Sequence, residues 1–202
     1  LKADQRAARE IQERILPDDV EDIEGLHIEY AMQASLVLSG DFLDILRLRN
    51  GRVLFYLADV SGHGASSALV TVLLKNITSR VMRSYHKEKS TTPDNPDALL
   101  ALFNRELLLT SLGKHLTIFV GLIDQHANSL DYAIGGHHPM PILVQGGAAR
   151  SLEGRGMPIG LFEEPSFERH QVELDQKFEL FLFSDGILEV LGGDNLDEKE
   201  QN

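Results

Sequence analysis

The sequence predicts an α+β layered fold, and three observations support this class. Short apolar segments typical of strands come first, two segments with helical spacing follow as a pair, and further strand-like segments come after them. Gly, Asn and Pro concentrate in the links between strand-like segments, as they do in hairpins. Because the helices are grouped and do not alternate with the strands, we expect a layered architecture and not a regular βαβ one.

The first part of the chain predicts one helix and three strands. Apolar residues recur at helical spacing among charged ones in residues 1–16, which predicts a narrow amphipathic helix that ends at Pro17. This helix is expected either to connect to an upstream domain or to pack on its own domain. Strands are predicted at residues 27–34, 41–48 and 52–59, with a strong Asn-Gly hairpin signal between the last two.

Two helices are predicted in the middle of the chain. Small and aliphatic residues recur at i, i+3 and i+4 over residues 65–85, which predicts a buried helix, and residues 96–110 predict a second one. Residues 87–97 are rich in Ser, Thr and Pro and predict the most flexible loop. Strand-like segments follow at 116–124, 129–134, 142–145, 168–174 and 178–184.

Composition limits the classes of function. The 202 residues, 43% of them apolar, suit one compact domain, and no apolar run is long enough for membrane insertion. The absence of cysteine excludes disulfides and thiolate metal sites and, with no signal peptide, favours a cytoplasmic protein. A net charge of -12 argues against nucleic acid or an anionic membrane surface as a partner. The first residue is Leu1 and not Met, which indicates a fragment of a longer chain.

Three aspartates stand where an apolar strand meets a tight turn: Asp41, Asp59 and Asp185. A short carboxylate at a strand end keeps its position, and a neighbouring Gly lets a metal or ligand approach closely. Converging carboxylates repel one another, and a hard divalent cation with oxygen ligands relieves that repulsion. The alternative interpretation is that each of the three is an ordinary turn residue.

Residues near these aspartates carry weaker signals. The Gly-rich string that begins at Asp59 lacks the Lys of a P-loop and a dinucleotide fingerprint, so it does not predict a nucleotide site. His63 in that string is expected to be structural and not an acid or a ligand. Asp44 could assist Asp41, but its place in an alternating strand favours a surface role.

Six motifs follow one another along nearly the whole chain: Ile11-Gln12 with Leu16-Pro17, Ser39-Gly40-Asp41-Phe42-Leu43-Asp44, Ala58-Asp59-Val60-Ser61-Gly62-His63-Gly64, Gly136-His137-His138-Pro139, Pro158-Ile159-Gly160 and Ser184-Asp185-Gly186-Ile187-Leu188-Glu189. This ordered set resembles the SpoIIE/RsbU branch of the type 2C protein phosphatase superfamily. Within it, the Asp-Val-Ser-Gly-His-Gly string is close to diagnostic.

The resemblance implies a four-layer α-β-β-α sandwich with two divalent ions, Mn2+ or Mg2+, in a cleft at one edge of the paired sheets. Asp59 would bridge both ions. Asp41 and the backbone carbonyl of Val60 would bind one ion, and Asp185 the other. Gly136, His137 and Gly160 would keep the shape of turns.

One departure from the family pattern concerns the end of the chain. Family members carry a further helix and strand with an Asp-Asp-x-Thr-like motif that completes the metal site. Here a polar run at residues 194–202 contains nothing comparable. We expect that the chain lacks its last elements; the alternative is a pseudophosphatase that lost them.

The resemblance implies a phosphoprotein phosphatase. Its substrate would be a phosphorylated protein of the anti-sigma-factor-antagonist type, and a receiver or sensor domain would lie upstream in the same chain. Residues 1–17 would then be a linker and signalling helix, able to pair in a homodimer, and 18–202 the phosphatase domain. The alternatives are a catalytically inactive adaptor, as in receiver-linked relatives resembling RssB, and a metal-dependent hydrolase of a small phosphorylated molecule.

Overall fold

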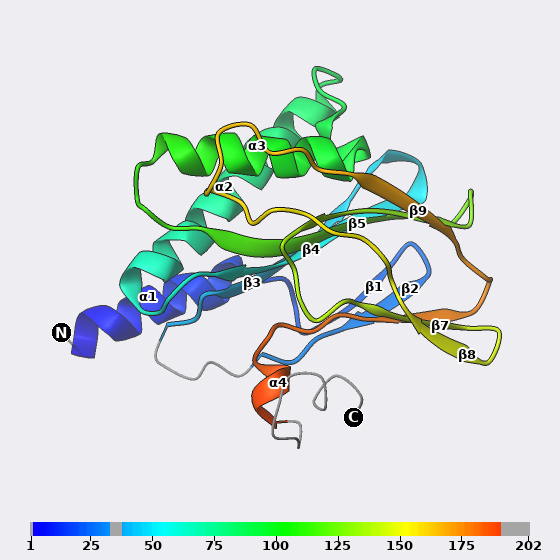
Figure 1. Cartoon of the computed structure of the whole chain (residues 1–202), viewed down its shortest axis with the longest axis horizontal. Coiled ribbons are helices and arrows are strands. Elements are labelled where there is room, and N and C mark those ends of the chain that lie inside the picture. The colour runs from blue at the N-terminus through cyan, green and yellow to red at the C-terminus, as the bar shows by residue number, and fades with distance from the viewer. Residues whose placement is uncertain (1, 33–37, 191–202) are drawn as a thin grey trace.

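The computed structural model describes residues 2–32 and 38–190 of the chain. Two long helices cover one face of a large antiparallel sheet, and a smaller sheet packs on the opposite face (Figure 1). One apolar core lies between the helices and the large sheet, and a second lies between the two sheets. The predicted α+β class is therefore confirmed.

The large sheet has the strand order β3-β4-β5-β6-β9, and every neighbouring pair of strands is antiparallel. β5 is buried on both faces: Ile118 and Val120 belong to the core under the helices, and Phe119 to the core between the sheets. This double burial explains why β5 is apolar throughout instead of alternating. The strands are β3 (Asp41–Arg47), β4 (Arg52–Val60), β5 (Leu116–Asp124), β6 (Ser129–Gly135) and β9 (Arg169–Glu173).

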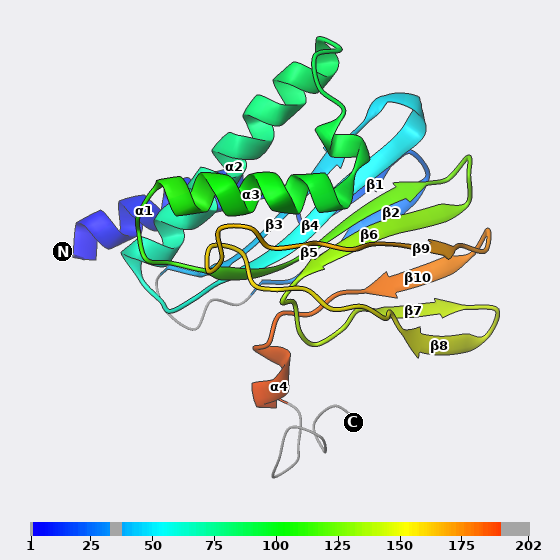
Figure 2. The same cartoon turned by 45° about the horizontal axis from the view of Figure 1, so that its top comes forward.

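Four α-helices occur in the described residues. α2 and α3 cross the outer face of the large sheet, and α1 lies beside the first half of α2 (Figure 2). α2 begins directly after the Gly-rich string that follows β4, so this helix is joined to the end of β4 by a short turn. The helices are α1 (Lys2–Ile15), α2 (Ala65–His86), α3 (Pro96–Leu109) and the short α4 (Ile187–Val190).

Two smaller sheets complete the described structure. A three-stranded antiparallel sheet has the order β10-β7-β8, and a separate hairpin pairs β1 with β2. Residues 182–186 connect β10 to α4 and bring the Ser-Asp-Gly motif to the start of β3. The strands are β1 (Val20–Ile23), β2 (Leu26–Glu29), β7 (Ile142–Gln145), β8 (Ala148–Ser151) and β10 (Phe178–Phe181).

Most predicted elements occur within one or two residues of their expected positions, and the differences have local causes. β8 was not predicted because its four residues are all exposed and show no apolar alternation. Residues 87–97, predicted as the most flexible loop, contain the 3-10 turn η2 (Thr92–Asp94) with a buried Pro93, and Asp94 pairs with Arg52 at 2.7 Å. Residues 33–34 of one predicted strand and the polar run at 194–202 lie outside the described residues.

None of the helices within residues 2–32 and 38–190 has the combined length and apolar character needed to cross a bilayer.

Candidate metal centre

Two of the three predicted aspartates form a pair across adjacent strands. Asp41, the first residue of β3, lies directly opposite Asp59, near the end of β4. The third segment reaches the same place, because the Ser184 hydroxyl donates a hydrogen bond to Asp41 Oδ2 at 3.2 Å. Like charges directly opposite each other destabilise a sheet, so this pair is costly unless positive charge balances it.

The electrostatics of the pair reflect this crowding. Burial, the charges of Asp41 and Asp185, and a hydrogen bond with the Asp185 carboxyl together raise the pKa of Asp59 to about 7. The pKa of Asp41 is also raised, mainly by burial and further by Asp185, although the hydrogen bond from Ser184 opposes the shift. The charge of Asp185 therefore acts on both Asp41 and Asp59.

Gly40 keeps a space open beside two of the predicted ligand oxygens. A Cβ built on Gly40 would lie 2.7 Å from the carbonyl oxygen of Val60 and 3.6 Å from Asp59 Oδ1. Any larger residue would therefore collide with the Val60 carbonyl oxygen. Carboxylate and carbonyl oxygens are the donors that Mg2+ and Mn2+ prefer, so the donor set fits a hard divalent cation.

The side chains of these donors are not already gathered as a finished site. In the described ranges, no group of three or more His, Asp or Glu side chains is arranged to hold a metal ion. The roles of Asp41, Asp59, Val60 and Asp185 as metal ligands stay predictions.

Helix α1 contacts the turn that precedes Asp41. The Gln12 amide donates to the Ser39 carbonyl oxygen at 2.6 Å, and the Ser39 N–H donates to Gln12 Oε1 at 3.1 Å. The Ser39 hydroxyl in turn accepts a hydrogen bond from the Asp41 N–H at 3.0 Å. Ser39 thus connects Gln12 to Asp41.

The predicted surface role of Asp44 is wrong. Its side chain is 1% exposed and pairs with Lys75 of α2 at 2.8 Å. Successive strand residues point to opposite faces, so Asp44 lies under the helices, on the other face of β3 from Asp41. Asp44 therefore cannot assist Asp41 and belongs to the helix–sheet packing. Burial raises its pKa, against the opposing effect of Lys75.

The two histidines of the motifs differ in environment. His63 is exposed on the loop between Gly62 and Gly64, both of which have positive φ angles. His137 is buried, and neither of its ring nitrogens has a hydrogen-bond partner within the described part of the chain. Burial, with a smaller effect of His138, lowers the pKa of His137 to about 4. A neutral buried ring is what a packing role for His137 requires.

Sequence reasoning did not find a basic residue that lies against the Gly-rich loop. The Lys114 ammonium donates to the Ser61 carbonyl oxygen at 2.9 Å and to the Ser67 hydroxyl at 3.3 Å. Lys114 lies outside every recognised motif. The signal that would have found it is its place just before β5, the strand that pairs with β4.

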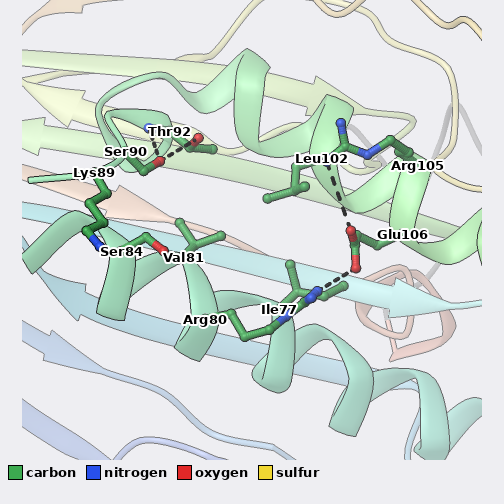
Figure 3. Close-up of a pocket in the computed structure, with 10 residues that line it drawn as sticks. All are labelled: Ile77, Arg80, Val81, Ser84, Lys89, Ser90, Thr92, Leu102, Arg105 and Glu106. Atoms are coloured by element: carbon green, nitrogen blue, oxygen red, sulfur yellow. Dashed lines mark hydrogen bonds and ion pairs between the residues drawn. The ribbon is translucent and has the colours of Figure 1, made fainter. Parts of the chain in front are cut away.

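A separate hollow of about 280 Å³ lies between α2 and α3. Figure 3 shows Arg80 and Arg105 at its rim, both facing Glu106. Ile77, Val81 and Leu102 supply apolar lining. It contains none of the predicted metal ligands, so we do not assign the chemistry of this protein to it.

The helices and the two packed sheets define the class of the protein: its fold is that of type 2C phosphatases. The SiaA-PP2C domain of Pseudomonas aeruginosa is similar with a TM-score of 0.73 and 19% identity, over 96% of this chain and 75% of that one. The PP2C domain of SpoIIE from Bacillus subtilis is similar with a TM-score of 0.57 and 18% identity, over 75% of this chain and 43% of that one.

Within this class the chain belongs to the SpoIIE family, because residues 49–202 match the family described as Stage II sporulation protein E. Phosphoserine phosphatase RsbP of Bacillus subtilis is 26% identical over 93% of this chain and 46% of RsbP. Phosphoserine phosphatase RsbU of the same organism is 22% identical over 94% of this chain and 54% of RsbU. The chain thus spans about half the length of these relatives.

Proposed function

We propose that this chain is a metal-dependent serine/threonine protein phosphatase domain. The observation that carries the proposal is the cross-strand pair of Asp41 and Asp59, which the Ser184 hydroxyl contacts at Asp41 and on which the charge of Asp185 acts. Membership of the SpoIIE family and similarity to two phosphoserine phosphatases support it.

In the proposed mechanism Asp59 would hold both metal ions, Asp41 and the Val60 carbonyl one of them, and Asp185 the other. When bound, two divalent cations supply positive charge that stabilises phosphoryl oxygens and activates water at neutral pH. Residues of the chain itself hold the proposed ligands in place. Strand β4 fixes Asp59, the Ser184 hydroxyl orients Asp41, and Gly40 leaves room beside the Val60 carbonyl.

Further parts of the proposal concern the context of the domain. We infer a substrate of the anti-sigma-factor-antagonist type, phosphorylated on serine or threonine, in the cytoplasm. A receiver or sensor domain upstream would signal through α1, which would also provide a homodimer contact. The contact between Gln12 and Ser39 supports this role of α1, because it connects the helix to the turn before Asp41.

The test is Mn-dependent release of phosphate from a seryl-phosphorylated anti-sigma-antagonist-type protein. Asp59→Asn is the control, because it removes one charge and keeps the side-chain shape. We expect metal-dependent turnover that Asp59→Asn reduces at least about a thousandfold, the scale of a lost transition-state interaction. Binding of the partner without turnover would instead indicate an adaptor, and turnover of small phosphate esters alone a hydrolase of metabolites.

A further inference from the structure

Lys114 is fixed against the loop that follows Asp59. Its ammonium is held by the Ser61 carbonyl oxygen and the Ser67 hydroxyl, so it is tied to both the loop and the first turn of α2. A Cβ built on Gly62 would lie 3.0 Å from Lys114 Nζ, which means that the ammonium packs directly on this glycine. The lysine therefore has a defined place and is not a freely moving surface side chain.

The charge of Lys114 is not matched by a carboxylate. Within residues 2–32 and 38–190, no Asp or Glu forms an ion pair with it, and its two hydrogen-bond partners are neutral oxygens. An ammonium has three N–H donors, so one donor remains for a further acceptor. Lys75, by contrast, is paired with Asp44 and has no comparable free charge. Lys114 is therefore a cation that is held beside the Gly-rich loop and is available to an anionic group.

The register of the sheet places Lys114 beside the loop that follows Asp59, because the Ser61 N–H donates to the carbonyl oxygen of His115. Asp59 is paired with Thr117, which lies three residues, or roughly 10 Å of strand, after Lys114. Gly62 is also close to the aspartate turn, because its carbonyl oxygen would lie 3.5 Å from a Cβ built on Gly40. Gly62 is thus near both the lysine ammonium and the turn before Asp41.

With two divalent ions and a phosphoserine bound, the summed charge of the proposed site would be negative. A phosphoserine carries a charge of about -1.5 to -2 at neutral pH. Three aspartates and such a group together exceed the charge of two divalent ions by about half to one negative unit. One ammonium offsets this excess, and a hydrogen bond between an ammonium and a phosphate is of the strong, charge-assisted kind.

We infer that Lys114 binds the phosphoryl group of the substrate and so determines affinity for phosphorylated serine or threonine. This inference rests on the proposed function, and it adds a contact that the metal ligands do not provide. The competing role is a positioning one, in which Lys114 only holds the Ser61 carbonyl and thereby the loop that carries Val60. If Lys114 binds phosphate, Lys114→Met should leave the Mn affinity unchanged. If Lys114 only positions the loop, the same change should lower the Mn affinity.

The experiment compares Lys114→Met with Lys114→Arg, which keeps the charge, and with Lys177→Met, which removes one exposed charge in the turn between β9 and β10. Calorimetric titration of inorganic phosphate into the Mn-loaded protein gives a Kd that does not depend on turnover. Titration of Mn alone and thermal unfolding report on the loop and the fold. The KM and kcat for the phosphoprotein complete the set.

We expect Lys114→Met to weaken phosphate binding about tenfold and to raise KM by a similar factor, the size of one lost charged hydrogen bond. The Mn affinity of Lys114→Met should equal that of the natural chain. Lys114→Arg should retain most of the phosphate affinity, and Lys177→Met should change neither the phosphate Kd nor the KM. An unchanged phosphate Kd, or no phosphate binding by the natural chain, would overturn the inference. A parallel loss of Mn affinity would also overturn it and assign Lys114 to loop positioning.

The outcomes separate the inference from the proposed function. If the natural chain does not hydrolyse phosphoprotein but its phosphate affinity still depends on Lys114, the proposed function fails and the binding role stands. If the natural chain is active and Lys114→Met leaves both KM and phosphate affinity unchanged, the inference fails and the proposed function stands.

Discussion

The side chain of Gln12 bonds to both the N–H and the carbonyl of Ser39, at 3.1 and 2.6 Å. This pair of hydrogen bonds connects a helix at the start of the chain to the turn before Asp41, across 27 residues. Gln12 is 7% exposed and also donates to the Thr71 hydroxyl on α2, so α1, α2 and the turn meet at one side chain.

The first prediction is that Gln12→Ala uncouples α1 from the candidate site. The substitution leaves the partly buried backbone N–H and carbonyl of Ser39 without their Gln12 partners, which costs on the order of 1 kcal/mol of the free energy of unfolding. We also expect a higher Mn concentration for half-maximal activity, because the Asp41 turn loses its support. Urea unfolding and Mn titration measure the two effects. Glu13→Ala, an exposed change on the same helix, should alter neither by a comparable amount.

The second prediction concerns the space kept by Gly40. In Gly40→Ala the new methyl group would meet the Val60 carbonyl oxygen at 2.7 Å, so the loop must move and the predicted ligand with it. We expect at least about a tenfold loss of Mn affinity and a destabilisation of about 1 to 3 kcal/mol, as for other overpacked sites.

Gly186→Ala is the matched control for Gly40→Ala. It adds the same methyl group next to Asp185, but the nearest atom, the Ser184 hydroxyl oxygen, lies at an ordinary 3.7 Å. Equal Mn affinity of the two variants would contradict a metal site beside Gly40.

The third prediction follows from the corrected place of Asp44. Lys75→Met leaves a buried carboxylate unpaired and should destabilise the protein by about 3 kcal/mol, the lower end for a broken buried pair, because Lys75 itself is partly exposed. Asp44→Asn removes the charge that burial disfavours, and the partly exposed Lys75 can then bind water. We therefore expect the free energy of unfolding to fall by less than about 1 kcal/mol. Chemical denaturation of both variants tests this asymmetry, and equal costs would argue against it.

The fold and the candidate site were predictable from sequence to different degrees. The apolar periodicity of α2 and β5 and the motif around Asp59 are local signals, and these elements lie where they were predicted. The environments of Asp44 and Lys114 depend on which strand or helix packs against them, and no local pattern carries that information. Asp44 was expected at the surface because β3 alternates, and only the presence of α2 over that face makes it buried.

The closeness of Asp185 to Asp41 is a long-range property of the same kind. Their motifs are separated by more than a hundred residues, and the Ser184 to Asp41 hydrogen bond depends on how residues 182–186 leave β10. The motif resemblance predicted this meeting, whereas strand periodicity alone did not. The ordered set of motifs therefore predicted that the segments of Asp41 and Asp185 meet, and the predicted secondary structure did not.

The last prediction concerns stability at acidic pH and the buried His137. Its pKa is about 4 in the folded chain, below the value of about 6.5 expected when the chain is unfolded. Above pH 6.5 the ring is neutral in both states and has no pH-dependent effect. As the pH falls from 6.5 toward 4, the unfolded chain binds a proton that the folded chain does not, so stability is lost at about 1.4 kcal/mol per pH unit.

The integrated loss from His137 is on the order of 3 kcal/mol. Other groups titrate in the same range, so the measurement is the difference between the natural chain and His137→Leu in urea unfolding from pH 7.5 to 4.5. Leu suits the site, because neither ring nitrogen has a partner within the described residues that the change would strand. We expect the leucine variant to lose less stability on acidification, while parallel curves would mean that His137 is protonated in the fold.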